Sequence, residues 1–166
     1  GTGSVPIKEL NIGVVGAGSR GQGLMHLMKA IEGLNVTAFS EVIPFRVDEA
    51  QKIAPTAASY KDYRELLDQK DIDAVIVSTP FSMHDEMAID ALDAGKHVYC
   101  EKTMSKGIAE TQKVISKAKK SSKTFQTGHQ FHSSPLYKKV VQIVNSGYLG
   151  EITSFECQWN RNGDWR

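Results

Sequence analysis

The sequence predicts an α/β fold, in which helices cover both faces of a doubly wound, mainly parallel sheet. Short apolar runs alternate with longer segments whose apolar residues recur at helical spacing, and the connections between them are short. Parallel strands joined in this way need right-handed crossovers, which place helices on both sides of the sheet. A chain of 166 residues, 40% of them hydrophobic, is long enough to bury one sizeable core.

Each element has a local signal in the sequence. The first strand is β-branched and ends at a glycine, and the run Ala-Val-Ile-Val at 74–77 is the clearest buried strand. Pro44 opens a helix, and Gly33 and Gly95 end the helices before them. The predicted strands are 12–15, 35–40, 74–78, 97–100 and 124–127. The predicted helices are 19–31, 44–53, 62–69, 83–94, 108–120 and 135–145.

The end of the chain has a different character. Over 151–159 polar and apolar residues alternate, as in a strand with one buried face, and no further element follows. We therefore predict an extension over 1–10 and an α/β domain over 11–148. Residues 149–166 would be the first strand and linker of a second, α+β domain outside this chain. The chain is then expected to be the amino-terminal part of a longer protein.

Composition argues against several kinds of function. A net charge of +1, without a basic stripe interleaved with aromatic residues, predicts no nucleic-acid partner. No apolar run approaches the roughly 20 residues that cross a bilayer, so no membrane partner is expected. Cys100 and Cys157 lack metal-ligand spacing, and His129 and His132 have no evident third ligand, so no metal site is expected. Thiols in apolar, strand-like runs favour the cytoplasm, although an exported precursor without its leader would look the same.

A glycine-rich turn follows the first strand and opens the first helix. Gly16, Gly18 and Gly21 are spaced as G-x-G-x-x-G. In such a turn one glycine makes the bend, one admits a pyrophosphate, and one lets helix and strand pack closely. Free amides and the positive end of the helix dipole then face the anion. This context predicts a dinucleotide site.

An acidic residue ends the second strand. Glu41 stands twenty positions after Gly21, where a carboxylate can accept hydrogen bonds from the adenine-ribose hydroxyls. The same charge would repel the 2′-phosphate of NADP, so NAD is the expected cofactor. NADP is the alternative, because Arg20 or Arg46 can offset that charge.

The loop after the strand at 74–78 should face the glycine-rich turn, because ligands of these sheets bind at the carboxyl ends of the strands. Ser78 and Thr79 can contact the cofactor there, and Pro80 fixes the turn. His84 either contacts the cofactor or serves as a capping or packing residue of the next helix.

The strand at 97–100 leads into Glu101 and Lys102. A lysine at this end of the sheet can stabilise a substrate alkoxide as hydride leaves, and it can act as a general base. The alternative is an ordinary surface ion pair between Glu101 and Lys102.

These motifs together resemble the glucose–fructose oxidoreductase and inositol dehydrogenase (Gfo/Idh/MocA) family over nearly the whole chain. The resemblance rests on GVVGAGSRG at 13–21, STPFSMH at 78–84, AGKHVYCEKTMS at 94–105 and SGYLGEI at 146–152. It implies a two-domain NAD(P)-dependent oxidoreductase with a Rossmann domain and a sugar, polyol or cyclitol substrate. The second domain would supply substrate contacts and a homo-oligomer interface.

The resemblance also implies roles for individual residues. Glu101 and Lys102 match the first two positions of the family's Glu-Lys-Pro motif, whose lysine is implicated in catalysis. Thr103 replaces the proline, so a cis peptide bond there would be costly. The implied catalytic residues are Lys102 and Glu101. The implied cofactor contacts are Gly16, Gly18, Ser19, Arg20, Gly21, Glu41, Ser78, Thr79, Pro80, His84, Glu101 and Lys102.

Two other functions stay open. Some relatives hold NAD tightly and use transient oxidation to cleave a glycosidic bond without net redox change. A nucleotide-binding module without enzymatic activity would keep the same fold and the same glycine-rich turn.

Overall fold

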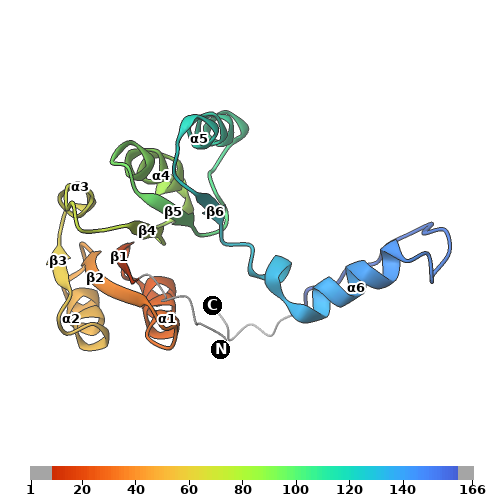
Figure 1. The fold of residues 1–166 in the computed structure, drawn as a ribbon, viewed down its shortest axis with the longest axis horizontal. Helices are drawn as coiled ribbons and strands as arrows, with labels where there is room; N and C mark the ends of the chain where they lie inside the picture. Colours follow the sequence, from red (N-terminus) through yellow and green to blue (C-terminus); the bar gives the residue numbers. More distant parts are fainter. Residues whose placement is uncertain (1–8, 161–166) are drawn as a thin grey trace, which may run out of the picture. The chain divides into compact units, whose positions relative to one another are not determined.

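A six-stranded parallel sheet forms the centre of the first part of the chain, with the strand order β3-β2-β1-β4-β5-β6 (Figure 1). The computed structural model describes residues 9–160. The strands are β1 (Leu10–Val15), β2 (Leu34–Ser40), β3 (Ala58–Tyr60), β4 (Ala74–Val77), β5 (His97–Cys100) and β6 (Phe125–Thr127). The order reverses between β1 and β4, so the carboxyl ends of these strands form the switch point where ligands of such sheets bind.

Helices cover the sheet, as the sequence predicted. They are α1 (Ser19–Met28), α2 (Pro44–Ile53), α3 (Tyr63–Leu67), α4 (His84–Asp93) and α5 (Ile108–Lys120), with a short 3-10 turn η1 (Phe81–Met83). Two further elements follow the sheet in the chain, the 3-10 turn η2 (Gln130–Ser133) and the helix α6 (Pro135–Asn145). Successive strand residues point to opposite faces. Val14 and Ile76 therefore join a core with α1 and α2, whereas Val15, Val75 and Val77 join a core with α3 and α4. None of the helices within residues 9–160 has the length and apolar character needed to cross a bilayer.

Three elements before Gly128 differ most from the prediction. Strand β3 was not predicted, because it has three residues and pairs only with β2, which leaves no alternation to detect. Helix α1 ends at Met28 instead of Ile31. Helix α3 is shorter than the predicted 62–69, and Asp62 precedes it as the N-cap, accepting a hydrogen bond from the Arg64 amide at 2.9 Å.

The chain forms two units, of which the first ends at Gly128 and the second begins at His129. The first unit thus ends earlier than the predicted domain boundary at 148. In the second unit, α6 starts at Pro135 and none of its residues is buried. The strand predicted over 151–159 is not formed, since residues 151–160 contain neither helix nor strand. A strand requires a neighbour to pair its backbone amides, and the sheet that the structure describes within residues 9–160 consists of β1 to β6.

Residues 1–8 and 161–166 lie outside the described residues. Most of the predicted extension and the end of the predicted linker are among them. The assignment of 149–166 to a second domain therefore stays a prediction.

Lys96 is a buried lysine that directly precedes β5, at the amino ends of the strands and away from the switch point, and we expect it to be important for stability. Its side chain is 5% exposed, and Nζ donates to the carbonyl oxygens of Gln69 and Ile72. Burial lowers the pKa of this ammonium group. Lys96→Met would leave both carbonyls without their donor, which typically costs about 1–3 kcal/mol of unfolding free energy. Urea unfolding followed by circular dichroism measures the change.

The matched control is Lys70→Met, which changes an exposed lysine in the loop that precedes β4. Its unfolding midpoint should stay close to that of the wild type. An equal loss of stability in both variants would contradict the importance of the Lys96 hydrogen bonds.

Candidate functional site

A crevice lies at the carboxyl ends of β1, β2 and β4, with a volume of about 410 Å³. It brings together residues from the glycine-rich turn, the end of β2 and the loop after β4. The sequence-predicted residues that line it are Gly16, Gly18, Ser19, Arg20, Glu41, Ser78, Thr79 and Pro80. Four other predicted residues do not line it, namely Gly21, His84, Glu101 and Lys102.

The glycine-rich turn is closely packed at two of its three glycines, where a side chain would collide with neighbouring atoms. Gly16 has a φ of +87°, and a Cβ there would lie 2.9 Å from the Thr79 amide nitrogen. At Gly21 a Cβ would lie 2.2 Å from the Gly16 carbonyl oxygen, which also accepts a hydrogen bond from Ser78 Oγ at 2.7 Å. Gly18 has more space, because the nearest atom to a Cβ placed there would be Arg46 Nη1 at 3.6 Å. The turn therefore packs tightly against Ser78 and Thr79 and leaves space at Gly18.

Helix α1 starts directly after this turn. Gly18 is its N-cap, and no side chain within residues 9–160 caps it. The amides of the first turn point toward the crevice end of the helix, where the helix dipole is positive. This arrangement fits an anion.

Glu41 is held in place by the backbone that follows it. Its side chain is 9% exposed, and Oε1 accepts hydrogen bonds from the amides of Val42 at 2.8 Å and Ile43 at 2.9 Å. Besides Arg20, the basic side chains of Arg46 and Lys61 line the same crevice. Glu41 thus presents a fixed carboxylate at the end of β2, with cations nearby.

Glu101 follows β5 and pairs with the glycine-rich turn. Its side chain is 5% exposed, and Oε1 accepts from Arg20 Nε at 2.8 Å and lies 2.6 Å from Arg20 Nη2. Oε2 accepts a hydrogen bond from the Lys102 amide at 3.2 Å. The alternative of an ion pair between Glu101 and Lys102 is therefore wrong, because Arg20 is the partner.

Tyr99 and Gly128 complete the surroundings of this ion pair. A Cβ at Gly128 would lie 2.8 Å from Tyr99 Oη and 3.1 Å from Glu101 Oε1. Burial, and then the charge of Glu101, raise the pKa of the Tyr99 phenol. A glycine at 128 is thus what lets the chain pass close to the buried carboxylate.

Lys102 has an exposed side chain in the loop after β5. The peptide bond between Lys102 and Thr103 is cis, contrary to the expectation that threonine in place of proline would disfavour that isomer. The backbone amide of Lys102 donates a hydrogen bond to the Glu101 carboxylate.

His84 occupies the interior instead of the crevice. The ring is 1% exposed, with Nδ1 at 2.7 Å from the Thr103 carbonyl oxygen and Nε2 at 2.8 Å from the Thr79 carbonyl oxygen. Both ring nitrogens therefore face the protein backbone. The prediction that His84 contacts the cofactor does not agree with this position, and the alternative of a packing residue does.

Sequence reasoning missed Lys61 as a crevice residue. It directly follows β3, the short edge strand that was not predicted. Recognising that strand would have placed Lys61 at a carboxyl end and so beside the switch point. Tyr99 lies within the motif at 94–105 but had no role assigned to it, and Gly128 lies outside the motifs; the proximity of both to Glu101 is evident only from the packing.

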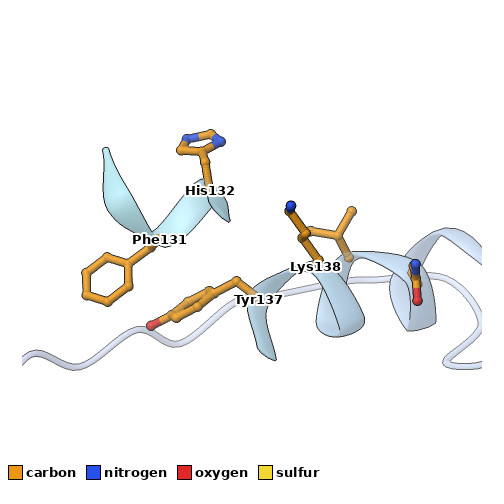
Figure 2. Close-up of a pocket in the computed structure, with 6 residues that line it drawn as sticks. Phe131, His132, Tyr137 and Lys138 are labelled. Atoms are coloured by element: carbon orange, nitrogen blue, oxygen red, sulfur yellow. The ribbon is translucent and has the colours of Figure 1, made fainter. Parts of the chain in front are cut away.

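The second unit has a separate pocket of about 520 Å³, lined by side chains of η2 and α6 (Figure 2). Phe131 contacts two other aromatic rings, those of Tyr137 and Trp159, with ring centroids 5.1 and 5.8 Å apart. The rings of His129 and His132 lie 6.2 Å apart in an edge-on arrangement. No group of three or more His, Cys, Asp or Glu side chains that could hold a metal ion occurs within residues 9–160.

Comparison with known proteins gives a consistent result. The profile of the oxidoreductase family with an NAD-binding Rossmann fold, GFO_IDH_MocA, matches residues 10–129. Inositol 2-dehydrogenase of Salmonella paratyphi B is 32% identical over 145 residues, which cover 86% of this chain and 43% of that protein. A glycosyl hydrolase family 109 protein of Shewanella amazonensis is 28% identical over 167 residues, covering 95% of this chain and 37% of that protein.

Among solved structures, scyllo-inositol dehydrogenase of Lactobacillus casei with bound NAD(H) and scyllo-inositol superposes with a TM-score of 0.78. It is 29% identical, and the match covers 88% of this chain and 44% of that one. The chain thus spans less than half the length of these relatives.

Proposed function

Because the chain belongs to the Gfo/Idh/MocA oxidoreductase family with its NAD-binding Rossmann fold, we propose that it is the coenzyme domain of a dehydrogenase. The substrate would be a sugar, polyol or cyclitol hydroxyl. The observation that carries the proposal is the crevice at the switch point, where an open glycine turn and a fixed carboxylate face one cavity. The same crevice has room for a nucleotide, and its residue types suit diphosphate and ribose.

The glycine-rich turn would hold the diphosphate. The Gly18 position is open, and the amides at the start of α1 carry no side-chain cap from residues 9–160. Oriented amides and the helix dipole favour an anion there. Arg46, beside Gly18, would add a positive charge.

Glu41 would bind the adenine ribose. Two backbone amides hold Oε1 and orient the carboxylate, so Oε2 is the oxygen that would accept from the ribose hydroxyls. A carboxylate in this fixed position would also repel a 2′-phosphate, which supports a preference for NAD over NADP. Arg46 and Lys61 line the same crevice and would weaken that repulsion.

Lys102 would be the catalytic residue. Bound NAD⁺ would accept hydride from the carbinol carbon of the substrate. Lys102 Nζ, in its neutral form, would take the hydroxyl proton and stabilise the oxygen as charge develops. Glu101 touches Arg20 and the Lys102 backbone, so we assign it a positioning role in place of the catalytic role that the resemblance implied.

Coenzyme preference tests the ribose assignment. The wild-type chain should bind NAD more tightly than NADP, and in Glu41→Ala the ratio of the two dissociation constants should fall by about tenfold, or 1.4 kcal/mol. The physical reason is the loss of both the ribose acceptor and the repulsive charge. Isothermal titration calorimetry with each coenzyme measures the ratio.

Glu32→Ala removes an exposed glutamate outside the crevice and serves as the control. It should keep the wild-type ratio. An unchanged ratio in a folded Glu41→Ala variant would refute the ribose role, and no binding of either coenzyme to the wild type would refute the proposed function.

A second candidate function is NAD-dependent glycoside cleavage. It is favoured by the similarity to a glycosyl hydrolase family 109 protein over 95% of this chain. The full-length protein would then hydrolyse an aryl glycoside without added coenzyme and without net NADH formation. Coenzyme-dependent oxidation of polyols would instead support the dehydrogenase. Coenzyme binding without either activity would point to a non-enzymatic module.

The proposal extends to the whole protein. We expect a homo-oligomer assembled through a second domain, and a cytoplasmic location. Size-exclusion chromatography with light scattering on the full-length protein tests the first expectation, and cell fractionation tests the second.

A further inference from the structure

His84 joins the two loops that flank the crevice. It is the first residue of α4, and its ring lies between the Thr79 carbonyl, in the loop after β4, and the Thr103 carbonyl, in the loop after β5. The Thr79 loop lines the coenzyme crevice. The Thr103 loop carries Lys102. One buried ring thus connects the coenzyme loop with the lysine loop.

The base of this connection is rigid. The residues of α4 that follow His84, including Met87, Ala88 and Ala91, are packed in the core beside β4 and β5. The ring itself is 1% exposed, so it has little freedom to turn. The His84 ring therefore fixes the position of the Thr103 carbonyl relative to the hydrophobic core in which α4 is packed.

The lysine loop is held from its other side by Glu101. The Glu101 carboxylate binds the Lys102 amide through Oε2 and Arg20 of the glycine-rich turn through Oε1. The backbone on both sides of Lys102 is thus anchored, while its side chain is exposed and free to reach a substrate. Of the two anchors, Glu101 connects the lysine loop to Arg20, beside the proposed diphosphate site. His84 connects it to Thr79 in the loop after β4.

From this geometry we infer that His84 is a positioning residue, which acts through the Thr103 carbonyl to set where Lys102 stands relative to the coenzyme. The inference rests on the proposed function of Lys102. His84 is buried and does not line the crevice, so it would act on Lys102 through the backbone.

The hydrogen-bond chemistry of the ring suggests how to test the role. A neutral imidazole has one N–H and can donate to one carbonyl, whereas a doubly protonated ring can donate to both. A glutamine side chain keeps an NH₂ group and can replace at least one of these donations. A leucine of similar volume can replace neither.

The activity test uses the full-length protein. In His84→Leu we expect kcat to fall about 10- to 100-fold, because a displacement of about 1 Å in a catalytic group can cost that much. The dissociation constant of NAD should change less than about threefold, because His84 does not line the crevice. That limit is well below the tenfold change that a loss of 1.4 kcal/mol in binding free energy would give. His84→Gln should recover most of kcat. The exposed His26 on α1 supplies the control His26→Leu, which should behave like the wild type.

A second measurement keeps the inference testable apart from activity. Reductive methylation with ¹³C-formaldehyde labels the lysines of the 166-residue chain, and Lys102→Arg identifies the Lys102 signal. In His84→Leu without coenzyme, this signal should shift or broaden, while the other lysine signals and the thermal unfolding remain those of a folded domain. If His84→Leu does not fold, His84→Asn takes its place, and His84→Gln remains the variant expected to keep the wild-type Lys102 signal.

The outcomes separate the two proposals. An unmoved Lys102 signal in a folded His84→Leu variant, or an unchanged kcat, would overturn the role of His84. A large loss of NAD affinity with unchanged kcat would also overturn it, since His84 would then act on the coenzyme. Failure of the wild type to bind coenzyme would overturn the proposed function instead, and the Lys102 signal would still report whether His84 holds that loop.

Discussion

Gly21→Ala is expected to abolish tight coenzyme binding and to destabilise the domain. The added Cβ would lie 2.2 Å from the Gly16 carbonyl oxygen and 2.9 Å from Ser78 Oγ. The Gly16 carbonyl belongs to the backbone and cannot rotate away as a flexible side chain can, so α1 must move away from the turn. Overpacking of this kind costs about 1–3 kcal/mol of unfolding free energy. The same movement displaces the amides that would face the diphosphate.

The binding loss should be at least about tenfold, equivalent to 1.4 kcal/mol. Calorimetric titration with NAD measures it, and urea unfolding measures the stability of the same sample. Gly23→Ala is the matched control, because a Cβ at Gly23 meets no atom within 4 Å. Alanine in an open helix position should raise stability by about 0.5–1 kcal/mol and leave binding unchanged. Wild-type affinity in Gly21→Ala would contradict the assignment of the diphosphate to this turn.

Lys102→Met in the full-length protein should lower kcat by about 10²- to 10⁴-fold, the range that general acid–base catalysis supplies. Methionine has a similar length and cannot take a proton. Coenzyme affinity should stay near that of the wild type, because Lys102 does not line the crevice. Initial-rate kinetics with the best substrate from a polyol and sugar screen give kcat, and calorimetry gives the coenzyme dissociation constant.

Lys106→Met is the control for this prediction, since Lys106 is exposed in the same loop. It should keep the wild-type rate. Wild-type turnover in Lys102→Met would remove Lys102 from the mechanism. A parallel loss of coenzyme affinity would show that the lysine acts in binding instead of in the chemical step.

The sequence was informative wherever the cause of the structure is local. The run at 74–77 forms a buried strand as predicted, and Gly16, at the bend that the motif predicted, has a positive φ, which glycine adopts without strain. The glycine turn between a strand and a helix predicted the crevice, and eight of the predicted contacts line it. Glu41 is a local case as well, because the amides that hold it belong to the next two residues.

Local patterns failed where an element depends on its neighbours. Strand β3 exists because β2 offers it an edge, and its own three residues carry no alternation. The residues at 151–159 alternate as a strand should, yet they form none within the described chain. Alternation indicates only that a segment would suit a sheet, and pairing decides whether a strand forms.

The sequence by itself therefore determined the fold class, the family and the positions of the coenzyme loops in the chain. Only the tertiary structure decided the partners within the site. Arg20 pairs with Glu101 across 81 positions of sequence, and His84 bridges to Thr103 across 19. The physical reason is that conformational preferences act over a few residues, whereas an ion pair or a buried ring depends on which loops the sheet order brings together.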